Sequence, residues 1–343
     1  MQFQTVDIDK FLELVGDGKK LLLDVRSEKE FEKAHIPHAV SLPLLSNADR
    51  HEVGIVYKSA GRQAAVLEGF TRVGPRFHEI IRRVMELAGG REVLLYCWRG
   101  GMRSNITAWM LQLAGLRVTL LRGGYKAFRR KMLTELDKSR SIIILGGKTG
   151  SGKTELLQLM REAGHAVIDL EGLAHHKGSA YGLLGQPPQP TQEQFENLLA
   201  WQLSGLSADL PVWLENESRL IGRIVLPSRL FDLMRQACVA EVMVSRSQRE
   251  ERILNEYGIF PAEDLATHTR RIGKRLGPLL LKEALTHLEK NDLRAWLKIV
   301  LDYYDSSYAY SNSQRDPLTL IQIPLDWENP QECIAALLKI KLR

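Results

Sequence analysis

Two short segments of this 343-residue chain carry residues whose types and spacing could do chemistry. The first is the thiol loop, Cys97-Trp98-Arg99-Gly100-Gly101-Met102-Arg103, with Ser104 directly after it. The second is the phosphate loop, which matches Gly-x4-Gly-Lys-[Ser/Thr] in full as Gly147-Lys148-Thr149-Gly150-Ser151-Gly152-Lys153-Thr154. One loop offers a sulfur nucleophile, and the other offers backbone N–H groups that bind phosphate. Few reactions need both, so the pair restricts the function more than either motif alone.

The thiol loop has the composition of a loop that stabilises a thiolate. Gly100 and Gly101 let the backbone curl so that successive N–H groups surround the sulfur, while Arg99 and Arg103 add positive charge. Ser104 is placed to begin the next helix, whose N-terminal dipole favours the same negative charge. A structural cysteine at a strand end is the alternative, but it would need neither two glycines nor two arginines after it. We therefore predict that the cysteine is catalytic.

The phosphate loop lies between the apolar segment 142–145 and a predicted helix, which is the context that gives this motif its meaning. Its N–H groups and the Lys153 ammonium would hold a diphosphate or a triphosphate, and Thr154 could reach a bound Mg²⁺. Titratable and charged residues near the ends of the following strands form a candidate second site: Asp169, Glu171, His175, His176, Glu215 and Arg219. The carboxylates could serve a metal or act as a base; solvated strand ends and a helix cap are the alternatives.

Composition and charge set broad limits on the function. With 44% hydrophobic and 26% charged residues, the chain is globular and long enough for two domains. A net charge of +6 and a pI near 9.1 are compatible with a polyanionic partner such as RNA. Basic pairs that suit a phosphate backbone occur at two places, and they are Arg129, Arg130, Arg270, Arg271, Lys274 and Arg275.

Cysteine usage and hydropathy indicate the compartment. Only Cys97, Cys238 and Cys333 are present, too few and too scattered for a disulfide framework or a zinc cluster. The first residues do not combine a basic segment with an apolar one, and no apolar run is long enough to cross a bilayer. We expect a cytoplasmic protein that binds no membrane, in which Cys97 stays a free thiol.

Short apolar strands alternate with amphipathic segments, which predicts an α/β fold with parallel sheets. In the first part, strands are expected at 21–25, 92–96 and 117–121, and helices at 49–60, 62–71 and 76–87. In the second part, strands are expected at 142–145, 167–169, 212–215, 240–245 and 318–323, with a helix at 153–162. Residues 182–191 read as a Gly- and Pro-rich loop, residues 248–310 as mainly helical, and a closing helix is expected from 331. We place one domain at 1–130, a charged linker at 131–140, and a second domain with a helical C-terminal part at 141–343.

The first domain resembles the rhodanese family. The resemblance is carried by Leu23-Asp24-Val25-Arg26, Ala34-His35-Ile36-Pro37-His38-Ala39 and Arg122-Gly123-Gly124-Tyr125. It implies a rhodanese-like parallel sheet and a cysteine that carries sulfur or selenium as a persulfide or its selenium analogue. Cys97 to Arg103 is Cys-x5-Arg, one residue longer than the loop of most single-domain sulfurtransferases. Dual-specificity phosphatases of the same fold share that length.

A rhodanese-like domain followed by a P-loop domain resembles the tRNA 2-selenouridine synthase family. Two further segments carry this resemblance, 169–179 and 214–219. It implies that 2-thiouridine at the wobble position of tRNAs for Lys, Glu and Gln becomes 2-selenouridine, with selenophosphate as donor. It also implies an S-geranyl intermediate made from geranyl diphosphate, and a partner enzyme that supplies selenophosphate.

Under this resemblance the two loops divide the work. Cys97, Arg99 and Arg103 would transfer selenium, with Trp98, Gly100, Gly101, Met102 and Ser104 surrounding selenophosphate, and the phosphate loop would hold geranyl diphosphate. Three other classes stay open: a P-loop kinase or NTPase coupled to a rhodanese-type sulfurtransferase, a phosphatase that forms phosphocysteine at Cys97, and a noncatalytic RNA-binding regulator.

Overall fold

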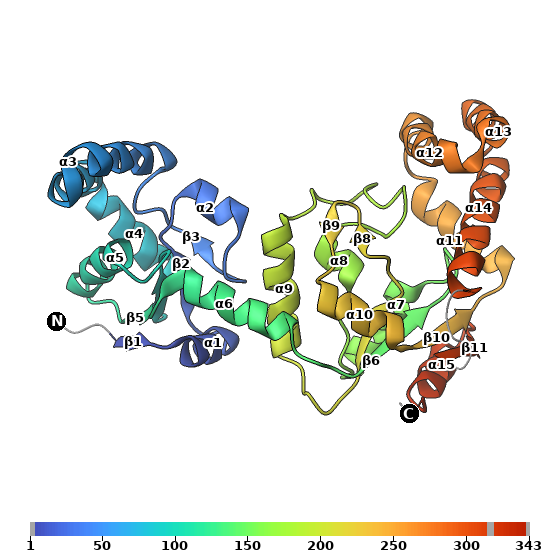
Figure 1. Cartoon of the computed structure of the whole chain (residues 1–343), viewed down its shortest axis with the longest axis horizontal. Coiled ribbons are helices and arrows are strands. Elements are labelled where there is room, and N and C mark those ends of the chain that lie inside the picture. The colour runs from blue at the N-terminus through green and yellow to red at the C-terminus, as the bar shows by residue number, and fades with distance from the viewer. Residues whose placement is uncertain (1–3, 314–318, 341–343) are drawn as a thin grey trace. The chain divides into compact units, whose positions relative to one another are not determined.

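The computed structural model describes residues 4–313 and 319–340, and the chain divides into two compact units (Figure 1). Unit 1 comprises residues 1–135 and 196–201, and unit 2 comprises 136–195 and 202–343. The division falls within the segment 131–140 that we expected to be a linker, although a helix continues through its first half, to Leu136. Within the described part of the chain, no helix is long and apolar enough to span a membrane.

Unit 1 is built around a parallel sheet with the strand order β1-β5-β4-β2-β3. Its strands are β1 (Gln4–Val6), β2 (Leu21–Asp24), β3 (Val40–Ser41), β4 (Val93–Tyr96) and β5 (Val118–Leu121). Its helices are α1 (Ile8–Gly16), α2 (Glu28–Lys33), α3 (Asn47–Val73), α4 (Phe77–Ala88), α5 (Met102–Leu113) and α6 (Gly124–Leu136), with a 3-10 turn at Gly74–Arg76. The three expected strands are therefore confirmed to within one residue at each end.

Both faces of this sheet are buried, which explains why its strands are continuous apolar runs rather than alternating ones. Alternate residues such as Leu23, Leu95 and Leu120 form one core with Ile80 of α4 and Leu111 of α5. The intervening strand positions are buried as well, among them Leu94 and Tyr96. Figure 1 shows α1 and α6 on the side of the sheet opposite to α4 and α5.

Helix α3 is broken at Gly61, whose φ of 83° and ψ of −175° are not helical. Only glycine adopts such a conformation at little cost, so the break follows from the sequence. It produces two helical arms, 47–60 and 62–73, which match the two helices expected at 49–60 and 62–71. The arms cover the same end of unit 1 (Figure 1).

Unit 2 contains a parallel sheet with the strand order β11-β10-β6-β7 and a small antiparallel pair, β8-β9. Its strands are β6 (Ile142–Gly146), β7 (Val212–Glu215), β8 (Leu220–Ile221), β9 (Ile224–Val225), β10 (Cys238–Met243) and β11 (Leu320–Pro324). Its first helices are α7 (Lys153–Glu162), α8 (Leu170–Ala174), α9 (Gln192–Ser204) and α10 (Ser228–Gln236). The C-terminal helices are α11 (Arg246–Tyr257), α12 (Ala262–Leu276), α13 (Pro278–Glu289), α14 (Leu293–Ser313) and α15 (Pro330–Leu337). The middle turn of α9, residues 196–201, belongs to unit 1.

Two predictions for unit 2 are wrong. The strand expected at 167–169 is only a single bridge, Val167 to Trp213, because Asp169 instead caps helix α8. Leu279 and Leu280 were expected in the helical core, but they are 83% and 46% exposed. The remaining elements are confirmed, including the irregular segment 182–191 and the mainly helical region after 248, although residue 318 of the last expected strand lies outside the described residues.

Candidate functional site

The thiol loop lies at the carboxyl end of β4, directly before α5, where open parallel sheets place their ligand sites. The Cys97 Sγ lies 3.1 Å from the Ser104 Oγ, and the Gly101 N–H donates to the sulfur at 3.2 Å. Cys97 is 3% exposed, so a substrate must reach the sulfur through the loop that surrounds it. The expected arrangement of a thiol among N–H groups at a helix N-terminus is present.

The loop is held in shape by the turn that precedes α6. The Tyr125 N–H donates to the Cys97 carbonyl at 2.8 Å, and the Lys126 N–H donates to the Trp98 carbonyl at 3.0 Å. Gly124 has a φ of 58°, and a Cβ there would stand 2.6 Å from Gly100 N and closer still to the Cys97 carbonyl oxygen. The two segments pack backbone against backbone, which is why the turn needs glycine.

The two arginines of the thiol loop differ in their surroundings. Arg103 makes a bidentate ion pair with Glu30 of α2, with N–O distances of 2.7 and 3.3 Å, while Arg99 is exposed. Burial alone would raise the pKa of Glu30, but Arg103, the Ser27 N–H and the Arg50 charge outweigh it and lower the pKa to about 2. Glu30 therefore orients the Arg103 guanidinium at neutral pH, a role that the sequence did not indicate.

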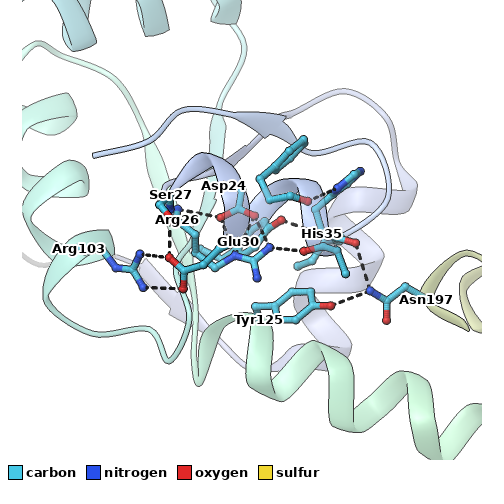
Figure 2. A network of polar contacts seen from close by, with 12 residues as sticks. Asp24, Arg26, Ser27, Glu30, His35, Arg103, Tyr125 and Asn197 are labelled. Carbon is cyan, nitrogen blue, oxygen red and sulfur yellow. Dashed lines mark hydrogen bonds and ion pairs between the residues drawn. The ribbon is translucent and has the colours of Figure 1, made fainter. Parts of the chain in front are cut away.

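A buried network beneath the loop explains the rhodanese-like signature (Figure 2). Arg26 is 1% exposed and donates to Asp24 at 2.6 and 3.0 Å and to the Ala34 carbonyl at 2.6 Å. Its guanidinium lies 4.0 Å from the centre of the Tyr125 ring. The Tyr125 hydroxyl in turn accepts from Asn197 at 2.8 Å. These signature residues support the loop from inside the unit.

The phosphate loop connects β6 to α7, as expected. Gly147, Gly150 and Gly152 all have positive φ values, so the glycines of the motif supply the curvature of the loop. The Lys153 Nζ donates to the Gly147 carbonyl at 3.0 Å, which places its charge over the loop. Thr154 is exposed at the start of α7.

Residues far away in the sequence hold the phosphate loop in place. Arg249 of α11 is 3% exposed, pairs with Asp305 at 2.7 and 2.9 Å, and donates to the Thr149 carbonyl at 3.1 Å. The Trp327 indole donates to the Ser151 carbonyl at 3.2 Å, and the Tyr308 hydroxyl accepts from the Gly147 N–H at 2.6 Å. The predicted arginine-rich segment after 246 thus includes one buried structural arginine.

Carboxyl groups gather beside Lys153, and they include three of the predicted second-site residues. The Glu215 side chain is fully buried; its Oε2 accepts from the Leu170 N–H at 2.8 Å, and its Oε1 has no partner among the described residues. Burial, followed by the charges of Asp169 and Glu171, raises the pKa of Glu215 well above its usual range. A buried carboxyl with this environment is neutral at pH 7.

Glu217 belongs to the same cluster and was missed, because it lies two residues beyond the strand end. Glu171 and Glu217 share a hydrogen bond, and a Cβ at Gly178 would lie 2.6 Å from an oxygen of each. Burial, followed by the charge of Glu171, raises the pKa of Glu217, while the Lys153 charge opposes the rise. Burial also raises the pKa of Glu171. The pair therefore shares a proton next to the phosphate loop.

The other second-site candidates make contacts outside this cluster. His175 Nδ1 lies 2.9 Å from the Pro188 carbonyl, and Arg219 donates to Ser228 at 3.1 Å. His176 is 7% exposed, and burial, with the nearby charges of Arg271 and His268, lowers its pKa. Among the described residues, no group of three or more His, Cys, Asp or Glu could hold a metal ion.

The basic residues considered for RNA binding fall into two kinds. Arg129 is engaged by Glu196 and Asn197 within unit 1, whereas Arg130 is exposed. On α12 the four basic residues are all exposed and lie opposite the buried face that contains Leu265 and Ile272, and they are Arg270, Arg271, Lys274 and Arg275. They form one basic face, as their spacing predicted.

Comparisons with known proteins agree with the geometry of both loops. Residues 7–131 match the rhodanese-like domain, and residues 140–290 match the AAA domain of tRNA 2-selenouridine synthase. A tRNA 2-selenouridine synthase of Sulfurovum sp. is 36% identical, covering 84% of this chain and 88% of that protein. That of Hahella chejuensis is 36% identical over 90% and 89%, and that of Marinobacter nauticus is 34% identical over 92% and 94%.

One solved structure has a related part. The N-terminal domain of a putative ATP/GTP binding protein from Clostridium difficile is 38% identical, covers 37% of this chain and 97% of that domain, and has a TM-score of 0.35. The full-length relatives cover both units and both loops. The chain therefore belongs to the tRNA 2-selenouridine synthase family.

Proposed function

We propose that this chain replaces sulfur by selenium in 2-thiouridine at the wobble position of tRNAs for Lys, Glu and Gln, with selenophosphate as selenium donor. The observation that carries this proposal is the presence of a thiol loop and a phosphate loop, both fully formed, in a chain whose relatives are named for this reaction. The reaction takes place in the cytoplasm, where an enzyme that makes selenophosphate supplies the donor.

The phosphate loop is assigned to an activating step. A thiocarbonyl sulfur is a poor leaving group, whereas an alkylated sulfur departs from C2 as a stable thiol. In this step the 2-thiouridine sulfur attacks C1 of geranyl diphosphate, the C–O bond breaks, and diphosphate leaves. Lys153 and the loop N–H groups stabilise the departing charge. The proton shared by Glu171 and Glu217 reduces repulsion of the diphosphate by that carboxyl pair.

Mg²⁺ would fit beside the same group. Thr154 is exposed at the N-terminus of α7 and would hold the ion through its hydroxyl oxygen, together with phosphate oxygens. The bound ion would neutralise phosphate charge. The loop amides and Lys153 position the diphosphate in either case.

The thiol loop is assigned to selenium transfer, and electron balance limits how Cys97 takes part. Selenium in selenophosphate is already at the selenide level, so keeping it on Cys97 as S–Se⁻ would leave phosphorus as phosphite. The balanced step is attack by the Cys97 thiolate on phosphorus: the S–P bond forms, the P–Se bond breaks, and hydrogen selenide is released. The selenide adds to C2, the C2–S bond breaks, and geranylthiol leaves with the proton. Water then cleaves phosphocysteine to orthophosphate.

This assignment differs from the carrier role that the rhodanese resemblance implies for the cysteine, and the geometry of the loop supports it. The Cys-x5-Arg length suits a tetrahedral phosphorus group, Arg103 is held in a fixed orientation by Glu30, and the Ser104 hydroxyl is placed to stabilise the thiolate as a leaving group. Arg99, at the surface, is available to meet the incoming anion.

The test is mass spectrometry of wobble nucleosides from cells that carry Cys97→Ser or Lys153→Ala. We expect the cysteine variant to lack selenouridine and to accumulate the S-geranyl nucleoside, and the lysine variant to stop at 2-thiouridine. Cys238→Ser and Lys298→Ala are matched controls outside both loops and should resemble the wild type. Identical nucleoside profiles in the Cys97 and Lys153 variants would reject the division of labour.

The same proteins separate the other classes. ATP turnover that geranyl diphosphate does not affect would indicate a kinase or NTPase. Phosphate release from phosphoproteins or nucleotides at Cys97, with unchanged wobble nucleosides, would indicate a phosphatase. A biological role that survives Cys97→Ser would indicate a noncatalytic RNA-binding regulator.

A further inference from the structure

Unit 1 contains a pocket that neither loop assignment uses. Its volume is about 620 Å³, within the usual range for small-molecule sites. Both arms of α3 line it, because the break at Gly61 turns residues such as Val53 and Tyr57 toward the same space as Ala65 and Val66. The pocket is therefore a cavity between two arms of one helix, closed at one end by α5.

The walls of the pocket are apolar and open to solvent. Tyr57 is 58% exposed, Phe70 is 43% exposed and Met102 is 43% exposed, although all three line the same cavity. Large apolar side chains that remain exposed around one concave site are typical of a surface that covers an apolar ligand. The occupant should thus be largely hydrocarbon.

Charge at the pocket restricts the occupant further. The charged residues that line it are basic, and none of the lining residues is a carboxylate: Arg50, Lys58, Arg62 and Arg103. A hydrocarbon attached to a polyanion would meet both properties, the chain on the apolar walls and the phosphates against the basic residues. A neutral lipid or an acyl chain without phosphate would not use this charge.

The position of the pocket links it to the thiol loop. Met102 and Arg103 belong to that loop and also line the pocket. In an S-prenyl nucleotide, the first carbon of the prenyl chain is joined to the sulfur that C2 carries. When C2 lies at the thiol loop, the chain must therefore leave from that loop, and this pocket begins there.

We propose that this pocket holds the prenyl chain of S-geranyl-2-thiouridine in tRNA while selenium replaces the prenylated sulfur. This inference rests on the proposed function and deepens it, because it assigns recognition of the intermediate to unit 1. The pocket distinguishes prenylated from unprenylated tRNA, holds the leaving group during C2–S cleavage, and releases geranylthiol through its open side. The diphosphate site of unit 2 is not involved in this recognition.

The test fills the pocket without disturbing the loop. Gly54 is an exposed helical residue of the first arm of α3, it lines the pocket, and a Cβ there meets no atom within 4 Å. Gly54→Trp therefore adds bulk to the cavity and replaces a glycine inside a helix, which favours folding. Gln63→Trp adds the same side chain at an exposed position of the second arm, outside the pocket lining, and serves as the matched control.

The assay measures single-turnover selenation of two anticodon stem–loops with selenophosphate, one carrying S-geranyl-2-thiouridine and the other S-dimethylallyl-2-thiouridine. We expect Gly54→Trp to lose at least about tenfold in rate at limiting enzyme on the ten-carbon substrate and to keep the wild-type rate on the five-carbon one, since a pocket discriminates by chain length. Gln63→Trp should match the wild type on both.

Each other result counts against the inference. Equal rates of Gly54→Trp and wild type on the geranyl substrate would overturn it, as would an equal loss on both substrates, which would mean damage to the loop. A change in oligomeric state by sedimentation with selenation intact would show that a second copy of the chain covers the pocket. If the wild type forms no selenouridine from either substrate, the proposed function itself fails and the inference falls with it.

Discussion

Substitution of Glu30 by glutamine tests whether one carboxylate positions the thiol loop. Arg103 and its partners lower the pKa of Glu30 from 4.5 to about 2 against the opposing effect of burial. At about 1.36 kcal/mol for each pKa unit, this difference corresponds to about 3 kcal/mol of stability. The Glu30 side chain is only 14% exposed, so solvent screening reduces the value little. Glutamine keeps one acceptor oxygen, and we therefore expect Glu30→Gln to lower the stability of unit 1 by about 1–3 kcal/mol at pH 7.

The pH dependence of the difference follows from the direction of the shift. A carboxyl whose pKa is depressed in the folded state contributes stability above its unfolded pKa, and the contribution disappears as the pH falls through the folded pKa. For Glu30 this window runs from 4.5 down to about 2. The gap between wild type and Glu30→Gln should therefore be full at neutral pH and shrink within that window.

Urea unfolding followed by pulse-labelling hydrogen exchange measures this gap, because peptides of unit 1 are read separately from those of unit 2. Glu32→Gln removes an exposed carboxylate from the same helix and should change the stability little. The selenation assay on the same proteins should show that Glu30→Gln loses activity and Glu32→Gln does not. Equal stability of Glu30→Gln and wild type at neutral pH, or a gap of the same size below pH 4.5, would refute the reasoning.

Three further results are expected. Gly124→Ala should abolish selenation and destabilise unit 1, because its Cβ would press on the thiol loop, whereas Gly115→Ala has a similar positive φ but open space around it and should cost only the backbone strain; nucleoside analysis and unfolding compare them. Glu217→Gln should gain stability relative to wild type in unit 2 as the pH rises above 4.5, because a raised folded pKa favours the protonated form and stability is lost on ionisation; exchange at about pH 5 and about pH 8 measures this. Alanine at the basic residues of α12 should weaken tRNA binding and reduce its salt dependence by about one counterion per lost phosphate contact, measured by filter binding at several salt concentrations: Arg270, Arg271, Lys274 and Arg275.

The fold could be predicted largely from the sequence because its strands are short continuous apolar runs bounded by glycine or charged residues. Residues 21–24, 93–96 and 142–146 are buried on both faces, and such strands leave an unambiguous pattern. The strand expected at 167–169 failed because Asp169 also fits a helix cap, and the tertiary structure uses it as one. Leu279 and Leu280 failed because periodicity identifies a stripe but does not say whether another element covers it.

The two loops were found because their chemistry depends on contiguous residues. Glu30, Asn197, Asp305 and Trp327 were not found, since each supports a loop from another part of the chain through a single ion pair or hydrogen bond. No local pattern marks such residues. The pocket of unit 1 was equally invisible, because it depends on how the break at Gly61 turns one arm of α3 toward the other.

The supporting residues suggest why the rhodanese-like signature extends beyond the thiol loop. Asp24 and Arg26 are buried together with Tyr125 above the guanidinium, and removing one charge of such a pair costs about 3–5 kcal/mol because the other is left buried and unpaired. The ion pair lies beneath the turn that fixes Gly124 against the thiol loop, so its cost is repaid as loop geometry rather than as net stability. Arg103 is fixed by Glu30 in the same way, which leaves exposed Arg99 as the loop arginine able to follow an anion as its charge moves. A loop with one fixed and one mobile arginine suits a reaction in which phosphate stays at the sulfur while selenide departs.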